Sequence, residues 1–209
     1  MIRNIIWDLD GTLFDTYPAI AKAFKAALND LGHDAPPDWI ESLAKISLGH
    51  CASILIEKYQ LTEEALEQAF DRYYSHTRPA EQPPFPGVRA VCQFVCSLGG
   101  KNVIVTHRGC AGMLELLAAN QMTDYFAGYL THDDGYPKKP DPAAFEAILQ
   151  AHDLKREETI AVGDRDIDIQ AGRAAGVFTC LFGDEVEGIT ADFTVRSFDE
   201  LYRHIKSVE

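Results

Sequence analysis

The chain has 209 residues, 46% of them apolar, and a formal net charge of −13. This length suits one large domain, or one core with a smaller inserted domain, and the apolar share is enough for a real core. The acidity argues against nucleic acid and anionic membrane surfaces as partners, because both prefer surfaces rich in Lys and Arg. Most of the acids are expected to be ordinary surface charge, while a divalent cation can neutralise a local acidic site.

The start of the chain and its cysteines predict a cytoplasmic location. Met1 is followed at once by a strand-like run, without the basic start and longer apolar stretch of a secretory signal. No apolar run reaches membrane-spanning length. The cysteines are odd in number and form no Cys-x-x-Cys pair, which favours reduced, buried thiols. They are Cys51, Cys92, Cys96, Cys110 and Cys180.

Apolar runs typical of strands recur between helical patterns. Strands are expected at Asn4–Leu9, Asn102–Thr106, Ala127–Thr131, Thr159–Gly163 and Val177–Leu181. Helices are expected at Val88–Leu98, Ala111–Asn120, Pro142–His152 and Ile167–Ala175. Alternating strands and helices predict an α/β fold with a doubly wound parallel sheet.

Residues 16–85 interrupt this alternation with helical periodicity and no convincing strand. The expected apolar helix faces comprise Ile20, Phe24, Ala27, Leu28 and Leu31, and then Leu66, Phe70 and Tyr73 after a cap at Thr62. Between them, two shorter helices around Gly49 are indicated by Ile46, Leu48, Ile54 and Leu55. The prediction is a core domain of residues 1–15 and 86–209, with a small all-helical cap domain of residues 16–85 inserted after the first strand. Two chain crossings suit the cap to act as a lid over the strand ends.

Two acidic residues follow the first strand at a spacing of two. Asp8 and Asp10 lie in the segment Asp8–Thr12 (DLDGT), directly after the apolar run Ile5–Trp7. Ligands bind at the carboxyl ends of strands in open α/β sheets, and the strand period aims both side chains the same way. Two close carboxylates repel, so a cation or a shared proton is expected between them. The pattern indicates a metal-assisted site with a carboxylate nucleophile.

Three further segments fall at predicted strand ends or at a helix start. Thr106 ends the second strand, where its hydroxyl either donates to an anionic oxygen or caps the next helix. The run Lys138–Pro140 begins a helix, and by itself such a lysine pair favours a solvated surface. Asp164 and Asp168 lie four residues apart across a strand-to-helix turn, where either can also serve as a helix cap.

Together these residues supply the parts of a phosphoryl-transfer site. Mg²⁺ typically takes one or two carboxylates plus substrate phosphate. One carboxylate can attack phosphorus to form an aspartyl-phosphate, and a second can protonate the leaving oxygen and then activate water. A lysine and a hydroxyl would hold the remaining phosphoryl oxygens.

The order of the motifs resembles that of the haloacid dehalogenase superfamily of phosphotransferases. Asp8–Thr12 resembles the first motif, Thr106 the second, Lys139 before the proline the third, and Gly163–Asp168 the fourth. The resemblance covers nearly the whole chain, and the helical insert is similar to the small cap of the phosphoglycolate phosphatase-like branch. It implies a Rossmann-like core and Mg²⁺ as cofactor.

The resemblance also implies roles for the acidic residues. Asp8 would be the nucleophile and a Mg²⁺ ligand. Asp10 would be the general acid and base, with its main-chain carbonyl also on the metal. Asp164 would complete the protein ligands of the metal, and Asp168 would bind it directly or through water.

The transferring phosphoryl group would be bound by Thr106 and Lys139, the lysine being chosen over Lys138 because it directly precedes the proline. The backbone N–H groups of Leu9 and His107 would add donors.

Some residues depart from the family pattern. The second motif continues as His107 and Arg108, where small or amide residues are more usual. Arg108 either reads a substrate carboxylate or phosphate, or pairs with acids at the rim of the site. His107 is a candidate substrate contact, with a satisfied structural histidine as the favoured alternative. Arg165, also at a commonly small position, can pair with a neighbouring aspartate. His50, in the turn expected between the two short cap helices, is a candidate for substrate contact, with helix capping as the alternative.

The expected activity is Mg²⁺-dependent hydrolysis of a small phosphate monoester, phosphoglycolate-like or a sugar phosphate. A sugar phosphomutase is the alternative, favoured by Thr16 but opposed by Ile20, which stands where such mutases place a cap histidine. A non-catalytic phosphometabolite-binding protein is opposed by the intact catalytic set, and dehalogenation by the presence of Asp10. The expected partner is a small phosphorylated metabolite, not nucleic acid or membrane, and the chain is expected to be a monomer or a homodimer.

Overall fold

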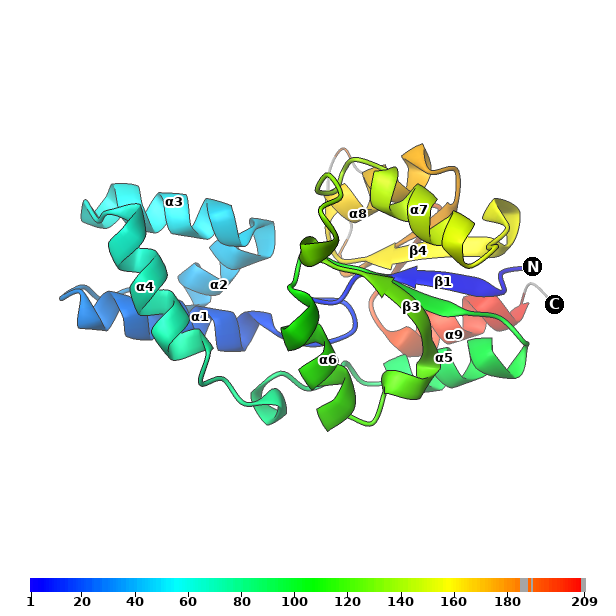
Figure 1. Cartoon of the computed structure of the whole chain (residues 1–209), viewed down its shortest axis with the longest axis horizontal. Helices are drawn as coiled ribbons and strands as arrows, with labels where there is room; N and C mark the ends of the chain where they lie inside the picture. Colours follow the sequence, from blue (N-terminus) through cyan, green and yellow to red (C-terminus); the bar gives the residue numbers. More distant parts are fainter. Residues whose placement is uncertain (185–187, 189, 208–209) are drawn as a thin grey trace. The chain divides into compact units, whose positions relative to one another are not determined.

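Figure 1 shows the computed structural model of the chain, which describes residues 1–184, 188 and 190–207. The chain forms two compact units, one of Met1–Phe14 with Pro84–Glu209 and the other of Asp15–Pro83. Among the described residues, no helix combines the length and the apolar character that crossing a bilayer requires.

A six-stranded sheet forms the centre of the first unit. Its order is β3-β2-β1-β4-β5-β6, and each neighbouring pair is parallel. The strands are β1 (Asn4–Trp7), β2 (Asn102–Val105), β3 (Phe126–Leu130), β4 (Thr159–Gly163), β5 (Phe178–Phe182) and β6 (Phe193–Val195). The central strands β1, β2 and β4 are buried throughout, as strands covered by helices on both faces must be. The expected α/β fold with a doubly wound parallel sheet is confirmed.

Helices cover both faces of this sheet, with α7 and α8 on one side and α5 and α9 on the other in Figure 1. Their bounds are α5 (Val88–Ser97), α6 (Cys110–Ala119), α7 (Ala143–Ala151), α8 (Asp166–Ala174) and α9 (Phe198–Ser207). Ile5 and Trp7 of β1 pack in one apolar core with residues of α5, α6 and α9, while Ile6 packs in the other with α7 and α8. The alternation of a strand thus feeds two cores. Short 3-10 turns lie at Thr123–Tyr125, His132–Asp134 and Arg156–Glu158.

The predicted elements of the sheet unit agree with the structure in type and place, with differences at their ends. The first strand ends at Trp7 rather than Leu9, because the backbone turns at the acidic segment. Two elements were not predicted. β6 has only three residues, too few for a clear alternation. In α9, Phe198, Leu201 and Ile205 are buried at helical spacing, a signal that the sequence did contain.

The second unit is all-helical among its described residues. It contains α1 (Tyr17–Asp30), α2 (Pro37–Ile46), α3 (Leu48–Tyr59), α4 (Glu63–Tyr74) and the 3-10 turn η1 (Pro79–Glu81). Its own apolar core contains Ile20, Phe24 and Leu28 of α1 with Leu55 and Leu66. The expected cap at Thr62 is present, since the Thr62 hydroxyl accepts the Ala65 N–H at 3.2 Å.

The predicted break around Gly49 is wrong by two residues. The chain breaks at Ser47, which is extended with φ −171° and ψ 158°, and its hydroxyl accepts the His50 N–H at 3.0 Å. This hydroxyl satisfies a free N–H at the helix start, so α3 begins at Leu48 and contains Gly49. Ile46 and Leu48, which lie on either side of this break, are 60% and 45% exposed.

All five cysteines are free thiols, as expected. Cys51, Cys92 and Cys180 are buried. The prediction of burial is wrong for Cys96, which is exposed, and for Cys110, which is partly exposed as the first residue of α6.

Candidate active site

The predicted site lies at the carboxyl edge of the sheet, where three neighbouring strands end. β2, β1 and β4 are adjacent. They are followed directly by Thr106, Asp8 and Asp164. The order of strands reverses between β1 and β4, and such a switch point is where open α/β sheets bind ligands.

The segment after β1 leaves the sheet in a tight turn. The Asp8 N–H donates to the Val162 carbonyl oxygen at 2.9 Å, which holds Asp8 at the edge of the sheet. Beyond it, the Gly11 N–H donates to the Phe14 carbonyl at 2.9 Å and the Phe14 N–H to the Leu9 carbonyl at 3.0 Å. Gly11 has φ 80°, a conformation that favours glycine. The turn is therefore fixed by its own backbone.

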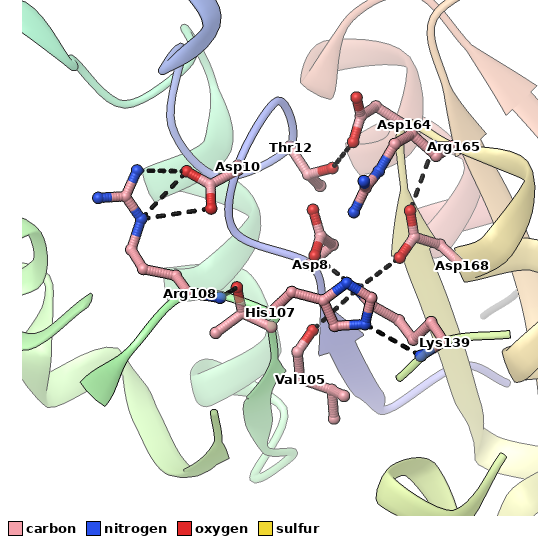
Figure 2. Close-up of polar contacts among 11 residues, drawn as sticks. Asp8, Asp10, Thr12, Val105, His107, Arg108, Lys139, Asp164, Arg165 and Asp168 are labelled. Atoms are coloured by element: carbon pink, nitrogen blue, oxygen red, sulfur yellow. Dashed lines mark hydrogen bonds and ion pairs between the residues drawn. The ribbon is translucent and has the colours of Figure 1, made fainter. Parts of the chain in front are cut away.

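Lys139 lies at the centre of a buried ionic cluster (Figure 2). Its Nζ lies 2.6 Å from Asp8 Oδ1 and 2.5 Å from Asp168 Oδ1, and it donates to the Val105 carbonyl oxygen at 3.1 Å. The contacts with Asp8 and the Val105 carbonyl are hydrogen bonds, and the contact with Asp168 is an ion pair. The lysine, Asp8 and Asp168 side chains are 1%, 3% and 2% exposed, so the cluster is shielded from water.

The protonation of this cluster is set by burial and by charge. Burial raises the pKa of Asp8 to about 6; the Lys139 charge opposes this rise, the Asp168 charge adds to it, and the Arg165 charge opposes it. Burial by itself lowers the pKa of Lys139, but the charges of Asp168 and Asp8 outweigh it and the pKa is raised. Lys139 therefore stays an ammonium ion, and Asp8 ionises near neutral pH without a metal.

Three carboxylates gather at one point. Asp8, Asp164 and Asp168 each place an oxygen within 4.8 Å of the other two. Asp8 Oδ2 is buried and has no hydrogen-bond partner among the described residues. Asp164 is oriented by the Thr12 hydroxyl, which donates to its Oδ1 at 3.1 Å. Oxygen donors and an unsatisfied carboxylate fit a hard divalent cation such as Mg²⁺.

Gly163 makes the approach of Asp168 possible. A Cβ on Gly163 would lie 2.2 Å from the Asp168 Cβ and 2.4 Å from its Cγ, so any other residue would displace that side chain. Asp168 Oδ2 also accepts the Arg165 N–H at 3.2 Å, which makes Asp168 a cap of α8 as well as a partner of Lys139. The helix-cap interpretation of Asp168 thus describes a contact that is present, its pairing with Lys139 was not predicted, and its role at a metal stays a prediction.

Asp10 faces away from this cluster, toward Arg108 (Figure 2). Arg108 Nη2 lies 2.5 Å from Asp10 Oδ1, and Arg108 Nε lies 3.1 and 3.2 Å from the two carboxylate oxygens. Arg108 therefore pairs with an acid, as one of the two alternatives has it, and its contact with a substrate anion stays a prediction. The Asp10 carboxylate is not part of the carboxylate cluster, and metal binding by its main-chain carbonyl stays a prediction.

Thr106 and His107 support neighbouring backbone. The buried Thr106 hydroxyl accepts the Arg108 N–H at 3.1 Å, which leaves its own proton for another acceptor. His107 Nε2 accepts the Lys139 N–H at 2.9 Å. Burial, followed by the charges of Lys139 and Arg165, lowers the pKa of His107 to about 4. The imidazole is therefore neutral with its proton on Nδ1, in agreement with the structural role considered for it.

The contacts predicted for His50 and Arg165 stay predictions. His50 belongs to the helical unit, where its N–H donates to Ser47, so its contact with substrate stays a prediction. Arg165 precedes α8 beside Asp168, and its charge acts on Asp8 and His107.

Sequence reasoning assigned no role to two groups at the site. Thr12 orients Asp164 through its hydroxyl. The sequence contained a signal for such a contact, because Thr12 follows Asp10 and Gly11 at the predicted turn. The Val105 carbonyl accepts from Lys139, and no sequence signal reveals a backbone acceptor that depends on a residue from a distant loop.

Comparison with known proteins gives a consistent family. The model of a family described as haloacid dehalogenase-like hydrolase matches residues 5–182. A phosphoglycolate phosphatase of Yersinia pestis is 32% identical over 185 residues, which cover 84% of this chain and 78% of that protein. A phosphoglycolate phosphatase of Photobacterium profundum is 29% identical, and the match covers 98% of this chain and 96% of that protein.

Solved structures agree on the fold. A crystal structure from Haemophilus somnus 129PT, described as a predicted phosphoglycolate phosphatase, has a TM-score of 0.86 at 20% identity and covers 97% of both chains. A hydrolase from Streptococcus pneumoniae TIGR4 has a TM-score of 0.67 at 28% identity, covering 88% of this chain and 94% of its own.

Proposed function

The chain belongs to the haloacid dehalogenase-like hydrolase family and is a phosphatase, and on this basis we propose that it hydrolyses small phosphate monoesters with Mg²⁺ through an aspartyl-phosphate. The proposed substrates are phosphoglycolate-like esters or sugar phosphates. The proposed setting is the cytoplasm, with the protein as a monomer or a homodimer.

The observation that carries the proposal is the state of Asp8. One of its oxygens is held by Lys139 at 2.6 Å, while the other is buried without a hydrogen-bond partner among the described residues. An oriented carboxylate with one free oxygen is suited to attack phosphorus. The ammonium of Lys139 also lies where it would neutralise the oxygens of a phosphoryl group bound at Asp8.

The carboxylates of Asp8, Asp164 and Asp168 are the proposed holders of the metal. Mg²⁺, when bound, supplies positive charge that offsets the repulsion between the nucleophile and the phosphate. Asp164 is oriented for this by Thr12, and Asp168 by Lys139 and the Arg165 N–H.

The chain's own residues divide the remaining work. Asp8 forms the bond to phosphorus while the ester oxygen leaves. Asp10 gives that oxygen a proton, then takes one from the water that cleaves the aspartyl-phosphate and regenerates Asp8. Lys139 and the Thr106 hydroxyl hold the phosphoryl oxygens through both steps.

One feature of the helical unit supports a phosphatase over a mutase. Ile20, which stands where mutases of this type place a histidine, is only 2% exposed and packs in the apolar core of the helical unit. An apolar side chain in that position can neither give nor take a proton.

The test is phosphate release from p-nitrophenyl phosphate, with Mg²⁺ or with EDTA. We expect turnover with Mg²⁺, loss of turnover in EDTA, and recovery when Mg²⁺ is restored. Acid quenching with ³²P-labelled substrate is expected to trap label on the peptide that contains Asp8. Absence of turnover across several metals and pH values would overturn the proposed hydrolysis.

A further inference from the structure

The pair of Arg108 and Asp10 differs from the buried cluster in its access to solvent. The two side chains are 12% and 24% exposed, whereas Lys139 and Asp8 are 1% and 3% exposed. The guanidinium contacts both oxygens of the Asp10 carboxylate. Planar two-point contact is the way in which arginine recognises carboxylates and phosphates.

The backbone of Arg108 is anchored on both sides. Its N–H donates to the Thr106 hydroxyl at 3.1 Å, and its carbonyl accepts the His132 N–H at 3.1 Å. Its side chain lies near Gly112 of α6, where an added Cβ would be 3.6 Å from Nη1 and 3.7 Å from Cδ. A change of partner by the guanidinium therefore needs rotation of the side chain and no movement of the loop.

The position of Asp10 indicates which part of a substrate would contact Arg108. Under the proposed function, the Asp10 carboxylate must reach the oxygen that leaves phosphorus. Arg108, in contact with that carboxylate, lies on the side of the site from which the leaving group extends. An anionic group on the leaving group would enter beside a guanidinium that already holds an anion.

We propose that Arg108 selects substrates whose leaving group carries a second anion, a carboxylate or a phosphate, by exchanging the Asp10 carboxylate for that anion. This inference rests on the proposed function. The exchange replaces one charge-assisted contact by another and frees the Asp10 carboxylate, which takes up a proton from solvent and transfers it to the leaving oxygen. A neutral leaving group has no anion to bind the Arg108 guanidinium. With such a substrate, the contact between Asp10 and Arg108 must break and no new ionic contact replaces it.

The test compares three matched esters with Mg²⁺: 2-phosphoglycolate, ethylene glycol bisphosphate and the neutral 2-hydroxyethyl phosphate. We expect wild-type kcat/KM to favour at least one anionic ester by about 10- to 100-fold, the range of a charge-assisted contact. The favoured ester identifies the anion as carboxylate or phosphate. Arg108→Gln is expected to lower this preference at least about 10-fold, and Arg108→Lys is expected to restore part of it.

Arg165→Gln is the control for net charge, because it removes a second guanidinium whose charge acts on Asp8. We expect the preference to survive in this variant. An equal loss of the preference for the anionic ester in Arg165→Gln would contradict selection by Arg108. The same conclusion would follow if Arg108→Gln lowered kcat/KM for all three esters by the same factor. A wild-type enzyme that favours the neutral ester would also contradict it.

Binding separates this inference from the proposed function. Asp8→Asn removes the nucleophile, so calorimetry can compare 2-phosphoglycolate, ethylene glycol bisphosphate and 2-hydroxyethyl phosphate without turnover, with and without Arg108→Gln. Preferential binding of the anionic ester that disappears in the double variant supports the role of Arg108 even if no ester is hydrolysed. Equal binding of the anionic and neutral esters, including the bisphosphate, refutes it even if hydrolysis occurs.

Discussion

Two ion pairs flank the same acidic segment and differ in nearly every physical respect. Lys139 joins Asp8 and Asp168 in a shielded cluster, with a backbone carbonyl as its third partner. Arg108 joins Asp10 in a pair that reaches solvent. A buried pair is costly to break because a bare charge remains, whereas water and other ions compete for an exposed pair. The first pair suits a fixed part of the site and the second an exchangeable one.

The largest expected effect of a substitution at either ion pair is at Asp8, the proposed nucleophile. Asp8→Asn is expected to lower kcat by about 10⁴-fold or more, because no other group can form the covalent intermediate. Stability should not fall in the metal-free protein. The folded pKa of about 6 lies above the ordinary 3.8, so the ionised carboxylate destabilises the fold above pH 6 and asparagine removes that penalty. Phosphate release and thermal unfolding at pH 7.5 measure both effects.

Retention of more than a few per cent of wild-type turnover by Asp8→Asn would reject Asp8 as nucleophile. A large loss of thermal stability in the metal-free variant would instead show that the Asp8 charge supports the fold.

Removal of the central lysine should affect both activity and folding. Lys139→Ala leaves Asp8 and Asp168 buried without their cation, so the free energy of unfolding is expected to fall by about 3–5 kcal/mol. We expect kcat/KM to fall about 10³-fold, because the loss of one preorganised charged donor is of that size. Urea unfolding and steady-state kinetics provide the measurements. Lys138→Ala, at the exposed neighbour, is the matched control and should change neither. Equal stability of the two variants would refute the fixed role of the cluster.

The affinity for Mg²⁺ should depend on Asp164 and not on Asp166. Asp164→Asn is expected to weaken Mg²⁺ binding by at least about 10-fold, because it removes a charged oxygen from the carboxylate cluster. Asp166→Asn, at an exposed position, changes the net charge equally and should leave affinity within about twofold. Titration calorimetry with Mg²⁺ alone decides between them, and equal weakening would show that only net charge matters.

The smallest expected effect concerns His107, which accepts the backbone N–H of Lys139. His107→Ala removes the acceptor of the Lys139 N–H and should destabilise the protein by about 1 kcal/mol, with partial rescue in His107→Gln. Because the folded pKa of about 4 lies below the ordinary 6.5, the unfolded chain binds the proton first. The contribution of His107 is therefore full above pH 6.5 and is lost as the pH falls through about 4.

The difference in stability between wild type and His107→Ala should shrink over that pH range. Nitrogen NMR should show the proton on Nδ1 at pH 7. A difference in stability that grows on acidification, or a proton on Nε2, would contradict this assignment.

Much of the molecule was accessible from local sequence patterns. The apolar runs before Asp8, Thr106 and Asp164 predicted three of the central strands, and those residues do stand at the strand ends. Strand and helix periodicity is a local property, so the α/β fold and the helical insert could be predicted. The helix break lies at Ser47 and not at Gly49, because the Ser47 hydroxyl caps α3 and the helix tolerates Gly49 in its first turn.

The sequence by itself determined that Asp8 and Asp164 directly follow strands, because strand periodicity and turn chemistry are local properties. Only the tertiary structure decided which cation faces which anion. Lys139 and Asp8 are 131 residues apart, and Arg108 and Asp10 are 98 apart. Their pairing depends on how distant loops pack and how much water each pair retains, and neither property is written in the spacing of the residues.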